Sequence, residues 1–259
     1  MISKNKIKWI RSLEMKKHRA AEGVFVAEGP KVVGDLLAAG FECVFMACTE
    51  EYDKKGRELW SIVDAKGVEV CWVTQEELER ISFVDTPQMV LAVFRQPEWQ
   101  WSEDEVESQL CLALDGVQNP GNLGTIVRLA DWFGIEYIFC SQGCADVYNP
   151  KTVQATMGAL ARVKVCFVDL IKLLSDAHKK NVPVYGTFLN GDSIYDKVLE
   201  QRGLIVMGNE GRGISKGVEA LVTDRLYVPH YPQGRSTTDS LNVAIATAVV
   251  CAEFRRRVV

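Results

Sequence analysis

The stretch LIVMGNEGRGIS, residues 204–215, joins a short apolar run to a glycine-rich loop, which is the pattern of a buried strand followed by a tight turn. The loop lacks the Lys-Ser or Lys-Thr ending of a Walker loop and the GxGxxG spacing of a dinucleotide site. Glu210 would also repel a bound phosphate. The loop therefore favours a cationic ligand or a partner such as Arg128. The alternative is a plain strand-to-helix turn capped by Ser215.

Other short apolar runs in the second half of the chain alternate with helical patterns in the same way. The predicted strands are 110–115, 136–140, 163–167, 183–188, 203–207 and 225–228. Strands that alternate with helices are typical of a mostly parallel sheet covered by helices, which places this half in the α/β class. Ligands of such sheets bind beyond the carboxyl ends of the strands, where three unusual loops fall in this sequence.

The first part of the chain repeats the alternation on a smaller scale, with apolar runs such as VFVAEG and QMVLAVF and helical patterns such as KVVGDLLAAG. We expect a small α/β domain over residues 1–95. The segment 96–108 breaks the pattern with Pro97 and a cluster of acidic residues, so it predicts an interdomain linker. A second domain then covers residues 109–259.

The composition is that of a globular protein, with 47% apolar residues among 259 and a net charge of −4. We find no signal-peptide pattern and no apolar stretch of the roughly eighteen residues that a membrane helix needs, so we expect a cytoplasmic protein with no membrane contact. The eight cysteines show no paired CxxC spacing, so we expect reduced core thiols and no metal site. Cys140 and Cys144 could instead form a redox pair.

The first twenty residues, MISKNKIKWIRSLEMKKHRA, concentrate positive charge. They hold seven lysines and arginines against Glu14 alone, and Ile7, Ile10 and Leu13 stand at helical spacing. A basic amphipathic first helix could lie along a phosphate backbone. A solvated surface helix is the alternative.

The first unusual loop is LDGVQNPGNLGTIVRLADWFG, residues 114–134. Asn119 followed by Pro120 is a typical helix start, because Asn caps free amides and Pro has none to leave unpaired. An apolar stripe then places Asn122 and Arg128 on a neighbouring row, where Arg128 would point at the sheet edge. An ion pair with Asp131 is the alternative for Arg128. The stripe consists of Ile126, Leu129, Ala130 and Phe133.

The third loop begins at VPHYPQGRSTTDSLNVAIATA and leads into a helix with a basic end, residues 228–257. Thr238, Asp239 or Ser240 could cap this helix. Ser240 and Asn242 would then lie in its first turn, where free amides bind an oxygen or a carboxylate. The small apolar residues favour a buried core helix or a subunit interface.

Taken together, the three loops resemble the three motifs of the SpoU family, the RNA ribose 2′-O-methyltransferases of the knotted SPOUT class. NPGNLGTIVRLADWFG is similar to the first motif, LIVMGNEGRGIS to the second and SLNVAIATA to the third, in the family's order and spacing. YNPKTVQATMGAL, residues 148–160, resembles a further family segment. FVAEGPKVVGDLLAAG is similar to the start of the family's ribosomal-protein-like substrate-binding domain.

This resemblance implies S-adenosylmethionine as the methyl donor. It also implies a parallel sheet with a C-terminal trefoil knot, a homodimer whose active site forms at the interface, and RNA, more specifically ribosomal RNA, as the substrate. The implied catalytic residues are Asn122, Arg128, Glu210, Ser240 and Asn242. The implied donor-binding residues are Thr187, Leu189, Gly208, Asn209, Gly211, Val228, Pro229 and Leu241. The implied RNA-binding residues are Lys4, Lys8, Arg11, Lys16, Lys17 and Arg19.

An arginine has a pKa above about 12 and is a poor general base, so we expect Arg128 to clamp the target phosphate and the developing alkoxide, oriented by Glu210 and Asn122. Two departures from the family pattern concern RNA fit: the loop HYPQGRSTTD is longer than usual, and Gln154 stands where a basic residue is expected. The rival interpretations are an RNA-binding protein that keeps the fold without catalysis, and a methyltransferase acting on transfer RNA.

Overall fold

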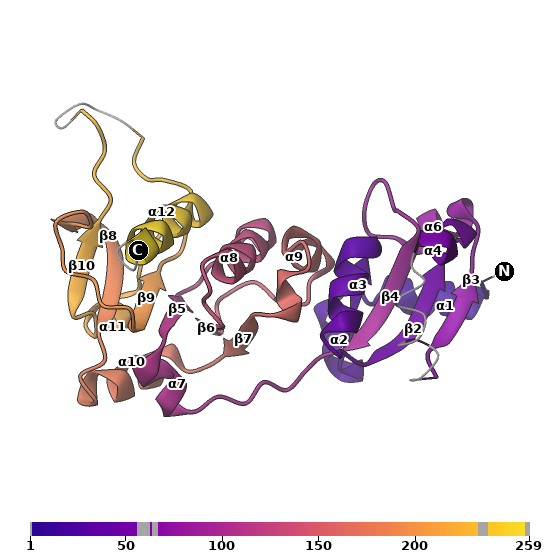
Figure 1. The fold of residues 1–259 in the computed structure, drawn as a ribbon, viewed down its shortest axis with the longest axis horizontal. Coiled ribbons are helices and arrows are strands. Elements are labelled where there is room, and N and C mark those ends of the chain that lie inside the picture. Colours follow the sequence, from indigo (N-terminus) through magenta and orange to yellow (C-terminus); the bar gives the residue numbers. More distant parts are fainter. Residues whose placement is uncertain (1, 56–62, 64–66, 233–237, 257–259) are drawn as a thin grey trace. The chain divides into compact units, whose positions relative to one another are not determined.

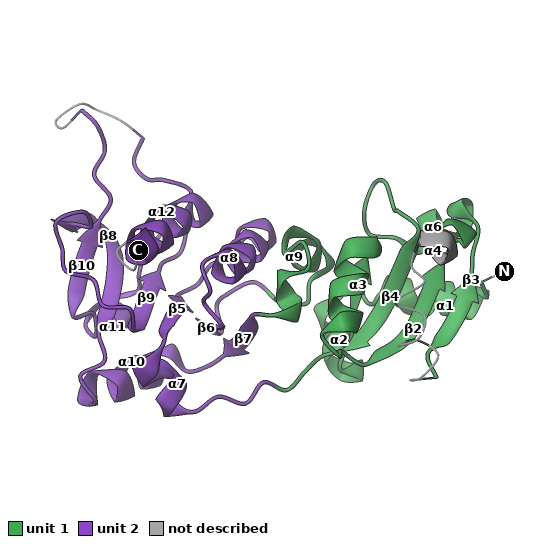
Figure 2. Cartoon of the chain, viewed as in Figure 1, with its two compact units in different colours: residues 1–98, 146–162 green, residues 99–145, 163–259 purple. Residues whose placement is uncertain are grey.

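The chain forms two compact units in a computed structural model that describes residues 2–55, 63, 67–232 and 238–256 (Figures 1 and 2). Unit 1 comprises residues 1–98 and 146–162, and unit 2 comprises residues 99–145 and 163–259. The chain therefore passes between the units three times.

Unit 1 is built on a sheet of four strands in its described residues, in the order β1-β4-β2-β3. β4 lies antiparallel to both β1 and β2, and β2 lies parallel to β3. The strands are β1 (Val24–Glu28), β2 (Cys43–Cys48), β3 (Glu69–Trp72) and β4 (Val90–Arg95). The helices described in this unit are α1 (Lys4–Ser12), α2 (Lys16–Glu22), α3 (Pro30–Ala38), α4 (Glu50–Lys55), α6 (Gln75–Ile81) and α9 (Pro150–Ala155), with the 3-10 turn η1 (Ala159–Ala161).

The basic segment at the start of the chain is helical, as predicted, but it forms two helices because the chain turns between α1 and α2. Leu13 is fully buried at this turn. Arg19 donates hydrogen bonds to the carbonyls of Leu13 and Glu14, both at 2.7 Å, and so closes the turn. Gly23 ends α2 with a φ of 64°, which a residue with a side chain rarely adopts.

Unit 2 contains a fully parallel sheet of six described strands in the order β10-β8-β9-β5-β6-β7, as the alternating pattern predicted. The chain runs from β5 outward to β7 and then crosses to β8 beyond β9. Loops after β5 and β9 therefore leave the sheet side by side, at a topological switch point. The strands are β5 (Leu110–Leu114), β6 (Tyr137–Cys140), β7 (Lys164–Phe167), β8 (Val184–Ser193), β9 (Gly203–Met207) and β10 (Asp224–Tyr227).

Helices cover both faces of this sheet. α8 and α12 pack against each other on one face, and α7, α10 and α11 pack over a buried apolar cluster on the other (Figure 1). These helices are α7 (Glu103–Ser108), α8 (Pro120–Trp132), α10 (Leu170–Lys179), α11 (Lys216–Glu219) and α12 (Val243–Arg256).

Part of the predicted linker, residues 96–108, is helical. α7 starts after Ser102, whose backbone amide donates to Glu105 while Glu105 also accepts from the Ser102 hydroxyl. This capping box organises the acidic cluster into a helix, and Val106 is buried in the apolar cluster of unit 2.

Candidate active site

The loops after β5 and β9 are joined at the carboxyl edge of the sheet. Leu114 pairs with Met207 at the strand ends. Just beyond, the amide of Asp115 donates to the carbonyl of Met207 at 2.9 Å, and the carboxylate of Asp115 accepts from the amide of Ser215 at 2.8 Å. Ser215 stands at the N-cap of α11 but makes no side-chain capping bond. The first and second sequence motifs therefore meet here.

The glycine-rich loop closes on itself. The backbones of Asn209 and Gly213 exchange two hydrogen bonds of 2.9 Å, and the Asn209 side chain accepts from the amides of Gly211 and Arg212 at 3.0 Å. A Cβ on Gly208 would lie 2.4 Å from the carbonyl carbon of Gly213, so only glycine allows this closure. The ring presents the next side chain, Glu210, toward the loop after β5.

Glu210 accepts hydrogen bonds from the start of α8. Its carboxylate receives the amides of Gln118 and Asn119, each at 3.3 Å, and the side-chain amide of Asn122 at 3.1 Å. Burial raises the pKa of this carboxyl, but the hydrogen bonds, that of Asn122 first, outweigh it and hold the pKa of Glu210 below its ordinary value. The two backbone donors were missed from the sequence, although amides just before Pro120 at a helix start have no helical partner.

Asn122 also connects the first motif to the third. The side-chain amide of Asn242 donates to the Asn122 side-chain oxygen at 3.1 Å. The side-chain oxygen of Asn242 accepts from the amides of Ala244 and Ile245, at 3.0 and 3.3 Å. A continuous chain of hydrogen bonds thus runs from Glu210 through Asn122 to the start of α12.

The cap predicted for α12 is wrong in its position. α12 begins at Val243, and Asn242 caps it, whereas Thr238, Asp239 and Ser240 lie before the helix. Asn242 can cap because its short side chain reaches the free amides of the first turn. Ser240 is exposed and its side chain has no hydrogen bond to a described residue. Part of the long loop predicted here, residues 233–237, lies outside the described residues.

Arg128 is exposed, and within the described part of the chain no hydrogen bond or ion pair engages it. The expected orientation of Arg128 by Glu210 is therefore wrong, and so is the alternative ion pair with Asp131. The reason is geometric: Arg128 lies six residues beyond Asn122, about 9 Å further along the helix axis at about 1.5 Å per residue. Glu210 instead finds its donors at the N-terminus of α8.

The predicted donor-binding residues surround the same edge of the sheet. Residues 187–191 of β8 project from the pairing with β10, because the register jumps from Gly186 to Asp192. Thr187 at the start of this projection donates to the carbonyl of Val206 at 3.0 Å. Leu189 is 69% exposed, and Leu241 is 50% exposed. Val228 and Pro229 follow β10 and are half-buried.

The predicted RNA-binding residues fall into two groups. Lys4, Lys8, Lys16 and Lys17 are exposed. The arginines are engaged: Arg11 donates to the carbonyl of Ser82 and lies 4.9 Å from the Phe83 ring centre.

Arg19 contradicts its prediction most clearly. Only 1% of it is exposed, and its guanidinium is bonded to Asp146 at 2.5 Å and to the two carbonyls of the α1–α2 turn. A side chain buried in this way cannot contact RNA in this conformation.

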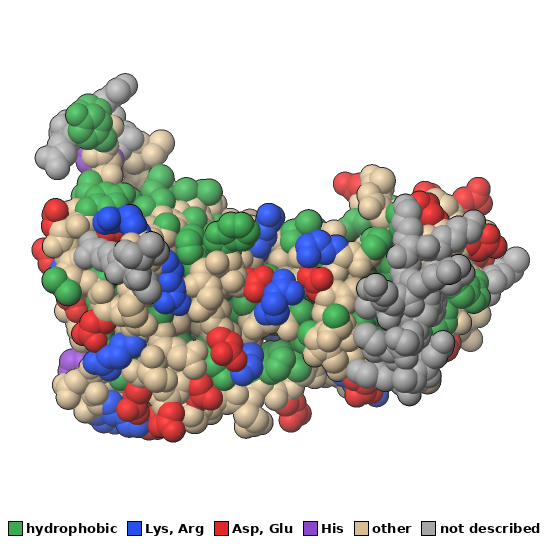
Figure 3. Space-filling view, viewed as in Figure 1, with side chains coloured by type: hydrophobic (Ala, Val, Ile, Leu, Met, Phe, Trp, Pro, Cys, Tyr) green, Lys and Arg blue, Asp and Glu red, His purple; other side chains and the backbone are tan. Residues whose placement is uncertain are grey.

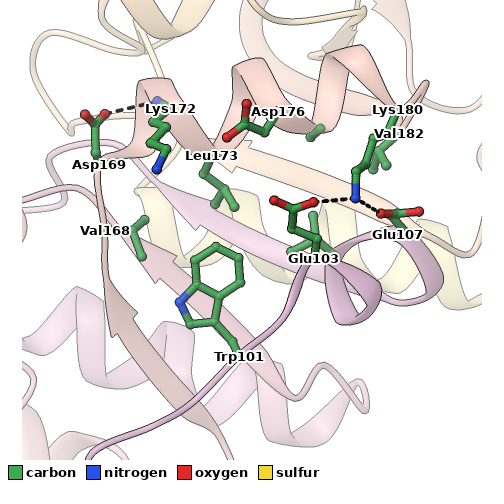
Figure 4. A pocket seen from close by; sticks show the side chains of 12 residues that line it. Trp101, Glu103, Glu107, Val168, Asp169, Lys172, Leu173, Asp176, Lys180 and Val182 are labelled. Carbon is green, nitrogen blue, oxygen red and sulfur yellow. Dashed lines mark hydrogen bonds and ion pairs between the residues drawn. The ribbon is translucent and has the colours of Figure 1, made fainter.

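A cavity of about 340 Å³ in unit 2 lies apart from these residues, between α7 and α10 (Figure 4). Its apolar floor includes Trp101 and Leu173, and Lys180 forms ion pairs with Glu103 and Glu107 at its rim. None of the predicted site residues lines it.

Three further observations bear on the composition-based expectations. All eight cysteines have free thiols, and seven are buried. No group of three or more His, Cys, Asp or Glu side chains among the described residues could hold a metal ion. No described helix combines the length and apolar character needed to cross a membrane.

The parallel sheet and its hydrogen-bonded loops define an α/β protein whose site lies at the carboxyl ends of its strands. The sequence model of the SpoU rRNA Methylase family matches residues 109–252, and that of the MRM3-like substrate binding domain matches residues 4–92. The chain therefore belongs to the SpoU rRNA methylase family.

Similar proteins cover nearly the whole chain. The 23S rRNA (guanosine(2553)-2′-O)-methyltransferase RlmP of Bacillus subtilis is 29% identical over 96% of this chain and 96% of its own length. A structure from Porphyromonas gingivalis assigned to the TrmH family of RNA methyltransferases is 42% identical, with a TM-score of 0.85 over 99% of both chains. An AdoMet-bound rRNA methyltransferase from Sinorhizobium meliloti is 29% identical, with a TM-score of 0.85 over 100% of this chain and 97% of its own. These likenesses confirm the predicted fold class.

Proposed function

We propose that the chain is an S-adenosylmethionine-dependent methyltransferase that acts on the ribose 2′-hydroxyl of ribosomal RNA. The observation that carries this proposal is the hydrogen-bonded chain Glu210–Asn122–Asn242, which joins all three family motifs at the carboxyl edge of the sheet. The full-length similarity to a 23S rRNA 2′-O-methyltransferase supports the substrate class.

The loops at this edge suit a donor with an apolar, a polar and a cationic part. Leu189, in the projecting part of β8, and Leu241, in the loop after β10, expose apolar side chains that a nucleoside would cover. The ring around Gly208 keeps the backbone free of side chains next to β9. When bound, S-adenosylmethionine supplies an electrophilic methyl group on a positively charged sulfur.

Some side chains at this edge hold the loops in place, while Arg128 and Ser240 are exposed and can contact the substrate. Glu210 and Asn242 fix the start of α8 through Asn122, so we assign them positioning roles. Arg128 projects from the same helix with its guanidinium unengaged by the described residues. We assign it the contact with the target phosphate and the developing alkoxide, which a guanidinium stabilises by charge-assisted hydrogen bonds. Exposed Ser240 lies two residues before the Asn242 cap and is left to contact RNA.

We also propose that the protein forms a homodimer and that its C-terminal part contains a trefoil knot. Figure 3 shows hydrophobic side chains gathered over α12 and α8, and Ile245 on α12 is 55% exposed. A second copy would cover this apolar surface. Analytical ultracentrifugation of the wild type and of Ile245→Glu tests the dimer: the variant should sediment as a monomer, and a monomeric wild type would refute it.

We place the reaction in the cytoplasm. Seven of eight thiols are buried and free, which suits a reducing compartment, and the proposed substrate is ribosomal RNA.

The test is methyl transfer by the purified protein. Ribosomal RNA from cells that lack the gene is incubated with labelled S-adenosylmethionine, and the RNA is digested and searched for a 2′-O-methylated nucleoside. Transfer by the wild type and none by Arg128→Ala is expected. Methyl transfer to purified transfer RNA alone would show that transfer RNA is the substrate. RNA binding without methyl transfer, together with no heat on titration with S-adenosylmethionine, would show that the protein is an RNA-binding protein without catalysis.

A further inference from the structure

The segment between β6 and β7 lies within the sequence match to the methylase domain, but in the structure it belongs to unit 1. Residues 146–162 lie inside the stretch that matches the methylase family, yet they pack with unit 1 (Figure 2). We propose that these residues are a docking segment, which the N-terminal substrate-binding unit holds through an Arg19–Asp146 ion pair, and that it positions bound RNA for methyl transfer.

The ion pair anchors the start of the docking segment. Asp146 accepts from Arg19 at 2.5 Å, and its side chain is 16% exposed against 2% for that of Arg19. The other oxygen of Asp146 accepts from the amide of Tyr148, and its carbonyl accepts from the hydroxyl of Thr152. The side chain and the backbone carbonyl of Asp146 together tie Arg19 of α2 to the start of α9. A buried charge needs its partner, so the pair can hold the segment only while both members are present.

Apolar packing continues the attachment along the segment. α9 lies against β1, where the rings of Phe25 and Tyr148 are 4.9 Å apart. Side chains on several turns of the segment are at most 1% exposed. These are Val147, Thr152, Val153, Thr156, Ala159 and Leu160.

The end of the docking segment is fitted to α3. η1 packs against α3, and Asp35 of α3 accepts from Arg162 at 3.4 Å. Gly158 has a φ of +92°, and a Cβ there would lie 2.3 Å from an Asp35 carboxylate oxygen and 3.2 Å from its Cβ. A side chain at position 158 would press on the Asp35 side chain and force it to move, so the glycine favours the fit to α3 as well as the turn.

The function follows from the chain path. The docking segment begins after β6 and ends before β7, and both strands belong to the sheet whose edge carries the proposed catalytic loops. RNA held by unit 1 is therefore linked to that sheet through the segment as well as through residues 98–99. Arg19 and Asp146 act as positioning residues, and this role rests on the proposed RNA methyl transfer.

The experiment compares full-length variants. Gly158→Ala blocks the fit to α3, and Asp146→Asn removes the charge that pairs with Arg19. Gly40→Ala is the matched control, because Gly40 also has a positive φ, +86°, but has nothing within 4 Å of the added Cβ. Hydrogen–deuterium exchange of residues 146–162 measures docking, calorimetry measures S-adenosylmethionine binding, and steady-state transfer to ribosomal RNA gives kcat and KM.

In both docking variants we expect faster exchange over residues 146–162 and a rise of about tenfold in KM for RNA, with kcat and S-adenosylmethionine affinity changed by less than about twofold. The control should match the wild type. A segment that stays protected in both folded variants, or that exchanges faster with no change in KM, overturns the inference. A wild type that transfers no methyl group refutes the proposed function instead, so the two failures are distinguishable.

Discussion

Two arginines with the same predicted partner have opposite surroundings. Arg19 is 1% exposed and bonded to a carboxylate and two carbonyls, whereas Arg128 is exposed and no described residue engages it. Both were predicted to contact RNA. An arginine whose two terminal nitrogens bond to acceptors inside the protein contributes to stability, while one whose guanidinium no described residue engages can bind a phosphate. The two sites should therefore respond to mutation in opposite ways.

The largest expected effect is on the stability of unit 1. Arg19→Ala leaves Asp146 partly buried without its partner and frees two carbonyls of the α1–α2 turn. We expect the free energy of unfolding to fall by about 3–5 kcal/mol, measured by urea denaturation at pH 7. Arg128→Ala is the control and should change it by less than about 0.5 kcal/mol. A loss below about 1 kcal/mol in Arg19→Ala would show that the Arg19–Asp146 ion pair contributes little to the stability of unit 1.

The same two variants should reverse their order in catalysis. Arg128→Ala removes the proposed contact with the phosphate and alkoxide. We expect the rate constant of methyl transfer, measured in single-turnover experiments, to fall about 10²- to 10³-fold. Arg128→Lys should recover little of this, because a lysine cannot make the paired hydrogen bonds of a guanidinium. Near-normal turnover in Arg128→Lys would exclude a bidentate contact and leave only a point charge.

The contrast also explains what could be predicted from the sequence. The rhythm of apolar runs predicted the parallel sheet of unit 2, and Asn119 and Pro120 marked the start of α8, because these signals are local. The burial of Arg19 depends on Asp146, which is 127 residues away in sequence. Nothing in the basic segment itself distinguishes Arg19 from Lys17, since charge patterns carry no information about distant partners.

The candidate site shows the same division. The family motifs predicted that Asn122, Glu210 and Asn242 belong together, and the hydrogen bonds join them. The motifs could not show that Glu210 binds the start of α8 in place of Arg128. That choice depends on the register of the helix against the loop, which only the folded chain determines.

The next effect concerns Glu210, whose contribution to the free energy of unfolding should depend on pH. Its pKa is below the ordinary value of 4.5, so its contribution to stability is present above about pH 4.5 and is lost as the pH falls through the lower folded pKa. Because Glu210 is exposed and water screens its charge, Glu210→Gln should cost less than about 1 kcal/mol of unfolding free energy at pH 7, and the difference from the wild type should vanish in acid. Urea denaturation at several pH values measures this. A difference that stays constant with pH would mean that the carboxylate charge is irrelevant.

Glu28 in unit 1 provides the opposite sign as a control. Burial raises the pKa of Glu28 despite hydrogen bonds from Ser82 and Phe83. Its contribution is fully present below the unfolded pKa and is lost as the pH rises through the folded pKa. The wild type should therefore gain stability relative to Glu28→Gln on acidification. If the stability differences of Glu28→Gln and Glu210→Gln from the wild type changed with pH in the same direction, the environments of the two carboxylates would not differ as described.

The smallest effect is expected at the exposed lysines that share the basic segment with Arg19. Lys16→Ala and Lys17→Ala should each weaken RNA binding about two- to fivefold at physiological salt and lower the slope of log K against log salt by about 0.7–0.9, the value for one lost phosphate contact. Fluorescence anisotropy with a ribosomal RNA fragment over a range of salt concentrations measures both quantities. Lys179→Ala removes an exposed lysine of α10 in unit 2 and should leave the slope unchanged. An equal change in all three variants would mean that the slope reports net charge, and that the basic segment makes no specific phosphate contact.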